Sequence, residues 1–243
     1  MLVDDLLTFL FDGGSHPQAA PMADWLNSSR RFTDFVNTYH TKIRKKVRTA
    51  QDPESLRDLQ LELETAYLLL RERSLSVAYE THHPRHGRSP DFAVSFTTRL
   101  VFMVEVTRLR AAQLTSSPAA TVAVPLPEDR FSDMVFSKLG QLLPQHSNVL
   151  LVGLDVPRLT QSELNAVMLR IQQRAEADDP AVVHRHGFRD RADFFRHYQR
   201  LSALLVRATQ LQAVDSVILW LNPQAKVPLP ARVRTALFNS HSL

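Results

Sequence analysis

The chain has 243 residues, of which 44% are hydrophobic and 22% charged, and its formal net charge at pH 7 is +4. These proportions are typical of a folded globular domain and exclude wholesale disorder. The absence of cysteine excludes disulfide bonds, thiolate metal sites and a cysteine nucleophile. The six glycines form no GxGxxG or GxxxxGK[ST] phosphate-binding loop, and the GxSxG motif of serine hydrolases is absent.

The longest apolar runs, at 148–154 and 216–221, are far shorter than a membrane-spanning helix. The N-terminus has two early aspartates and no basic region, so it does not resemble a signal peptide. We therefore expect a cytoplasmic protein with no membrane partner. The positive charge favours polyanionic partners, although only slightly for a chain of this length.

The first 27 residues contain a short apolar stretch followed by a connector with Gly and Pro. Apolar residues at helical spacing then predict a helix up to about residue 50, with Ser28 or Ser29 as N-cap. This helix is strongly basic, and Arg44, Lys45 and Arg48 point away from its apolar stripe. Their face is either simply solvated or a surface that contacts phosphates.

A second helix is predicted from Pro53 to about residue 72, with Asp52 as N-cap. Glu62 and Glu64 lie on opposite edges of its apolar stripe. Alternating apolar and polar residues then predict three strands, around 75–80, 91–96 and 100–107.

The second half of the chain predicts a mixed succession of helices and strands. A helix is expected at 131–143, a buried strand parallel to its neighbour at 148–155, and a last buried strand at 216–221. Residues 160–177 and 190–209 read as two amphipathic helices. The order predicts an α/β fold with a mixed central sheet.

The second and third strands predict a pair of opposed carboxylates. If they form a hairpin turning at Thr98, opposed positions have indices that sum to 196, so Asp91 faces Glu105. Thr107 lies on the same side of the sheet. Oxygen ligands from two strands are what a magnesium-type site needs, and Glu62 or Glu64 would strengthen it. The alternative is that Asp91 caps a turn and Glu105 pairs with an arginine.

The histidines give a weaker metal signal. His82, His83 and His86 have spacings seen in zinc sites, but Pro84 and Gly87 interrupt the segment and no further ligand is evident. A loop above the carboxylates is the preferred interpretation. His184 and His186 are read as surface loop residues, and Trp25 and Trp220 as packing residues.

Together these elements resemble the PD-(D/E)xK nuclease superfamily. The resemblance rests on the helical segment LELETAYLLL, on Pro90-Asp91 opening a strand, and on Val104-Glu105-Val106-Thr107 in the next. It covers about residues 55–155 in an α-β-β-β-α-β order. It implies a restriction-endonuclease-like core within an α/β domain at 53–243, with a helical extension at 1–52 and further helices after the core.

The sequence departs from the superfamily at the motif lysine, where it has Thr107. In such nucleases the carboxylates hold Mg²⁺ or Mn²⁺ while the lysine orients or polarises the attacking water. Lys138 on the following helix is the natural substitute, with Gln141 on the same face one turn later.

The resemblance therefore implies Mg²⁺-dependent hydrolysis of nucleic acid. Asp91 and Glu105 are expected as metal ligands, Glu62 as an accessory acid and Lys138 as the catalytic cation. DNA is the more expected substrate than RNA, and a homodimer is possible. The alternative is a catalytically degenerate module that binds nucleic acid or a protein partner.

Overall fold

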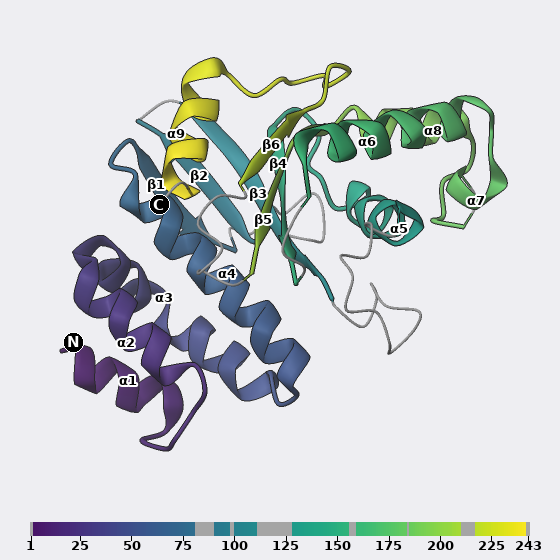
Figure 1. Ribbon diagram of the computed structural model, residues 1–243. Coiled ribbons are helices and arrows are strands. Elements are labelled where there is room, and N and C mark those ends of the chain that lie inside the picture. Colours follow the sequence, from purple (N-terminus) through teal and green to yellow (C-terminus); the bar gives the residue numbers. More distant parts are fainter. Residues whose placement is uncertain are drawn as a thin grey trace.

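The computed structural model describes residues 2–80, 90–97, 100–110, 128–155, 159–183, 185–209 and 217–241. They form an α/β fold around a six-stranded mixed sheet whose strand order follows the sequence, from β1 to β6 (Figure 1). The strands are β1 (Leu75–Tyr79), β2 (Phe92–Phe96), β3 (Leu100–Leu109), β4 (Ser147–Leu154), β5 (Leu201–Ala208) and β6 (Ile218–Leu221).

The first three strands are antiparallel, β3, β4 and β5 are parallel, and β6 is antiparallel to β5. The α/β class and the mixed sheet are thus confirmed. The hairpin register is confirmed too, because Phe92 pairs with Val104 and Ala93 with Met103, which keeps the index sum of 196. Every residue of β4 is buried, as expected of a strand with a parallel neighbour on each side.

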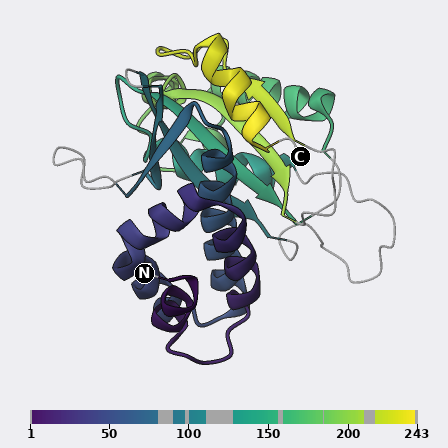
Figure 2. The same ribbon diagram turned by 90° about the vertical axis from the view of Figure 1, so that its left-hand side faces the viewer.

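Helices cover both faces of the sheet (Figure 1 and Figure 2). On one face lie α4 (Pro53–Arg71) and α9 (Ala231–His241), and α1 (Val3–Phe11), α2 (Ala19–Ser28) and α3 (Arg30–Thr49) pack on the outer side of α4. All five share one apolar cluster with the strands. The other face carries α5 (Glu128–Leu139), α6 (Gln161–Glu176), α7 (Pro180–Val183) and α8 (Arg191–Tyr198), which share a second apolar cluster.

The helix starts follow from local capping chemistry. The Ser29 hydroxyl accepts a hydrogen bond from the Phe32 N–H, and the Asp52 carboxylate accepts from the N–H groups of Glu54 and Ser55. Both caps satisfy backbone donors that have no partner within the helix. The predicted caps of the two long helices are therefore confirmed.

Three sequence predictions about elements were wrong. The last strand was expected to be buried, but in β6 only Trp220 is buried and Leu221 is exposed. The helix expected over 190–209 ends at Tyr198, and the remainder is the buried strand β5. The chain before Ser29 also contains a helix, α2, where a connector was expected. In the part of the chain that the structure describes, no helix is long and apolar enough to cross a membrane.

Candidate functional site

The site begins where β2 is shorter than β3. β2 pairs with Leu100–Val104, and among the described residues no strand lies beside the remainder of β3, from Glu105 on, at that edge. We call the space beside this end of β3 the notch. Asp91 lies just before β2 and occupies part of the notch, because its Oδ2 accepts a hydrogen bond of 2.7 Å from the Val106 N–H. This end of β3 is therefore contacted by side chains from helices on both faces of the sheet, since Lys138 of α5 reaches Glu105 and Asp58 of α4 reaches Arg108.

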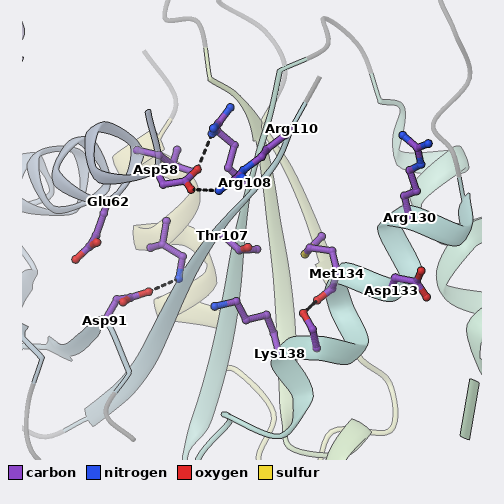
Figure 3. A pocket seen from close by; sticks show the side chains of 13 residues that line it. Asp58, Glu62, Asp91, Thr107, Arg108, Arg110, Arg130, Asp133, Met134 and Lys138 are labelled. Atoms are coloured by element: carbon purple, nitrogen blue, oxygen red, sulfur yellow. Dashed lines mark hydrogen bonds and ion pairs between the residues drawn. The ribbon is translucent and has the colours of Figure 1, made fainter. Parts of the chain in front are cut away.

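A pocket of about 600 Å³ occupies this notch (Figure 3). Its walls are the end of β3, α4 on one side and α5 on the other. Glu62 and Asp91 approach it from one side, and Lys138 reaches in from α5 (Figure 3). The lining residues are Asp58, Leu61, Glu62, Asp91, Val106, Thr107, Arg108, Arg110, Arg130, Asp133, Met134, Ser137 and Lys138.

Of the two opposed carboxylates predicted from the hairpin register, Asp91 has a raised pKa. Burial raises the pKa of Asp91 to about 6, and the negative charge of Glu105 adds to the rise. The Val106 N–H, Lys46 and Lys138 act in the opposite direction because they stabilise the ionised form. Asp91 is thus a carboxyl group whose charge this environment leaves only partly compensated.

Among the described residues, Lys138 forms an ion pair with Glu105. Its Nζ lies 2.8 Å from Glu105 Oε1 and also donates to Gln141 Oε1 at 3.3 Å. The Glu105 side chain is 10% exposed and that of Lys138 22% exposed. The structure therefore brings Glu105, Lys138 and Gln141 together. Asp91, Thr107 and Lys138 line the pocket, whereas Glu105 and Gln141 are not among its lining residues.

Glu62 joins this group from α4. The pKa of Glu62 is raised, mainly by burial and next by the negative charge of Asp91, whereas Lys46 acts to lower it. The Leu61 side chain of α4 packs directly over Gly153 of β4, where a Cβ would lie 2.5 Å from Leu61 Cδ2. A glycine at this position lets the Glu62 turn of the helix lie close to the sheet.

Glu64, the other candidate ligand on α4, does not reach the pocket. Its side chain is 2% exposed and pairs with the buried Arg207 of β5. The two-residue spacing places Glu62 and Glu64 on different edges of the helix, so only one can face the notch.

Sequence reasoning missed the cation on the other side of Glu62. Lys46 of α3 lies 2.6 Å from Glu62 Oε1 and 2.7 Å from Glu80 Oε1. It was visible in the sequence only as one of several basic residues on this helix. The sequence does not show which acid of α4 pairs with which base of α3, because the pairing depends on how the two helices pack.

A buried arginine at the same end of β3 was missed as well. The Arg108 side chain is 1% exposed and its guanidinium contacts Glu54, Asp58 and Asp155. Arg110 also contacts Asp58, at 2.8 Å. An arginine within a strand pattern, with acids one helical turn apart at 54 and 58, was the available signal.

The basic face of α3 is partly used within the protein. Arg44 and Arg48 both contact Asp12, and Arg44 also lies over the Phe9 ring, 4.3 Å from its centroid. Lys45 is exposed. The interpretation of this face as a phosphate-contacting surface stays a prediction.

Some of the predicted residues lie elsewhere. His82, His83, His86 and His184 are outside the described residues. His186 was expected on the surface, but its side chain is only 12% exposed, and its ring nitrogen Nε2 lies 2.9 Å from Asp133 Oδ1. Trp25 packs in the core, stacked on Tyr67, as expected.

No group of three or more His, Asp and Glu side chains is arranged to hold a metal ion among the residues that the structure describes. Comparison of the chain with protein-family models, with curated proteins and with solved structures found no match. Any assignment of function therefore depends on the geometry of the pocket.

Proposed function

We propose that the protein is a metal-dependent nuclease of the PD-(D/E)xK type in which Lys138 replaces the motif lysine. The observation that carries the proposal is the 2.8 Å contact between Lys138 Nζ and Glu105 Oε1, since Lys138 lines the same pocket as Asp91. The chain order α4, β1, β2, β3, α5, β4, with β3 parallel to β4, supports a restriction-endonuclease-like core.

The donor chemistry of the pocket fits a magnesium-type ion. Mg²⁺ prefers oxygen ligands and is often bound through only one or two carboxylates, with waters completing its shell. Asp91 and Glu105 would hold the ion, and Glu62 would be an accessory acid. The raised pKa of Asp91 indicates negative charge that a cation would stabilise. When bound, Mg²⁺ or Mn²⁺ would activate a water molecule and stabilise charge on the phosphoryl oxygens.

The residues of the chain have separate tasks in this proposal. The Val106 N–H fixes one oxygen of Asp91, which leaves the other oxygen to face the pocket. Lys138 orients Glu105 and presents a positive charge to the developing phosphorane. Gln141 restrains the ammonium group through a second hydrogen bond. Thr107 can offer a neutral hydroxyl but no charge.

The pocket lining favours a phosphodiester substrate. Arg110, Arg130 and Lys138 bring cationic groups to its walls, and guanidinium groups match phosphate oxygens well. We propose nucleic acid as the substrate, with DNA preferred to RNA. The competing function is a degenerate nuclease-like module that binds without cleavage, and Thr107 at the lysine position favours it.

A cleavage assay separates the two functions. The wild type is incubated with single- and double-stranded DNA and RNA in Mg²⁺, Mn²⁺ or EDTA. Asp91→Asn and Lys138→Ala test the site, and Lys226→Ala, at an exposed lysine outside the pocket, is the matched control. Metal-dependent cleavage that both site variants lose and the control keeps supports the nuclease. Binding without cleavage supports the degenerate module, and the absence of both contradicts the proposal.

A further inference from the structure

Lys46 reaches the candidate site from outside the segment that resembles the nuclease core. It belongs to α3, which packs on the outer side of α4. Its Nζ is within 2.7 Å of two carboxylates that come from different elements, Glu62 of α4 and Glu80 after β1. The ammonium also lies 4.9 Å from the centroid of the Tyr79 ring. Lys46 thus contacts two negative groups and an aromatic face, and its side chain is 28% exposed.

The backbone of Glu80 connects the Lys46 cluster, which consists of Lys46, Glu62, Glu80 and Tyr79, to Asp91 through a hydrogen bond. Glu80 has a left-handed φ of 45°, which is uncommon for a residue with a side chain. Its N–H donates to the Asp91 carbonyl oxygen at 2.9 Å while its carboxylate contacts Lys46. A second pocket, lined by Lys46 among others, shares Asp58 and Glu62 with the main pocket. The Lys46 cluster therefore adjoins the pocket directly.

We propose that Lys46 is a positioning residue that fills the place of a second divalent cation. Its ammonium holds Glu62 and Glu80 in one arrangement, so the nuclease site works with a single metal ion at Asp91 and Glu105. The count of one ion rests on the proposed function, whereas the role of Lys46 as a fixed cation rests on its own contacts.

The physical argument is one of charge and donor type. Glu62 and Glu80 would repel each other without a cation between them, and a fixed ammonium supplies that charge without an ion from solution. If the ammonium is removed, two carboxylates remain facing one space, which is a sufficient protein donor set for Mg²⁺ or Mn²⁺. A protein lacking Lys46 should therefore gain a metal site.

Three variants of the full chain test this proposal. Lys46→Met keeps the aliphatic stem and removes the charge, Lys46→Arg keeps the charge, and Lys45→Met is the matched control at the exposed neighbour. Bound Mn²⁺ per chain is counted by electron paramagnetic resonance, and Tm is measured in EDTA and in millimolar Mn²⁺. We expect one ion in the wild type, in Lys45→Met and in Lys46→Arg, and two ions in Lys46→Met.

In EDTA, Lys46→Met should melt below the wild type, and Mn²⁺ should raise its Tm by about 4 °C more than it raises that of the wild type. A purely structural lysine would give the loss in EDTA without this recovery. Adding Glu80→Gln to Lys46→Met should remove the extra ion. If Lys46→Met does not fold, Lys46→Gln replaces it with the same expectations.

The outcomes separate this proposal from the proposed function. One ion in both the wild type and Lys46→Met, with equal Mn²⁺ stabilisation, overturns the role of Lys46 and leaves the nuclease proposal intact. No ion in the wild type but one in Lys46→Met contradicts the metal site at Asp91 and Glu105 while supporting the role of Lys46.

Discussion

Two groups of carboxylates contact cationic side chains at the same end of β3, and their negative charges are compensated in different ways. Around Arg108, one buried guanidinium contacts three acids, from α4 and from the residue after β4. In the pocket, Lys138 contacts Glu105 through a single ammonium, and the pKa of the neighbouring Asp91 stays raised to about 6. The Arg108 group holds the N-terminal part of α4 against the sheet. In the Lys138 group, the surroundings of Asp91 still disfavour its negative charge, next to an open pocket.

This difference separates a structural ion network from a candidate site. A guanidinium has five donors in a fixed plane and can saturate several carboxylates at once, whereas an ammonium is a compact charge on a flexible stem. Perturbed carboxyl groups in a cleft are more often functional than ones that are fully paired. We therefore expect substitutions around Arg108 to change mainly stability and those around Lys138 to change mainly activity.

The largest change in stability is expected for Arg108→Met. It removes the buried guanidinium that Glu54, Asp58 and Asp155 share, while Arg110 still contacts Glu54 and Asp58, and the loss of a buried ion pair of this kind costs about 3 kcal/mol. Urea unfolding measures the loss. Arg57→Met is the matched control, because Arg57 contacts the same Glu54 from an exposed position and should matter little. Equal effects of the two variants would contradict the distinction.

Glu64→Gln is expected to cost about 2 kcal/mol of unfolding free energy because it leaves the buried Arg207 without its counter-charge. Glu62→Gln, two residues earlier on the same helix, should cost less than half as much, since burial already disfavours its charged form. Thermal unfolding of both variants measures the ratio. A larger loss from Glu62→Gln would mean that Glu62 is the structural member of the pair.

The third prediction is a gain in stability. An Asp91 carboxyl that ionises near pH 4 when unfolded and near pH 6 when folded binds more protons in the folded state between these values, so stability falls as pH rises through them. Asp91→Asn removes this fall and should stabilise the metal-free protein above pH 6 by about 2 kcal/mol. Unfolding in EDTA from pH 4 to 8 measures the difference. An Asp91→Asn variant with the wild-type pH dependence would contradict the assignment.

Much of this arrangement could be predicted from local patterns. The alternation of β2 and β3 determined which residues face each other, and the capping residues Ser29 and Asp52 located two helix starts. Lys138 was identified because the resemblance required a cation near Glu105. The register and the caps were confirmed because each depends on one hairpin or one turn, whereas the catalytic role of Lys138 stays a prediction.

The failures depend on packing between distant segments. All residues of β5 except Ala208 are buried, and a short apolar stretch such as ALLV does not distinguish a buried strand from a buried helix. Glu64 is buried in an ion pair, whereas Glu62 lines the pocket, and this difference depends on where β5 and its Arg207 lie. Lys46 meets Glu62 only because α3 packs on α4.

The most direct test of the central claim is metal-dependent cleavage by the wild type, Lys138→Ala and the double variant Lys138→Ala/Thr107→Lys. If Lys138 supplies the catalytic charge, the single variant should lose cleavage by orders of magnitude while it still binds Mn²⁺, because Asp91 and Glu105 remain. The double variant should recover part of the activity, since position 107 lines the same pocket. An active wild type whose rate is unchanged by Lys138→Ala would contradict the account.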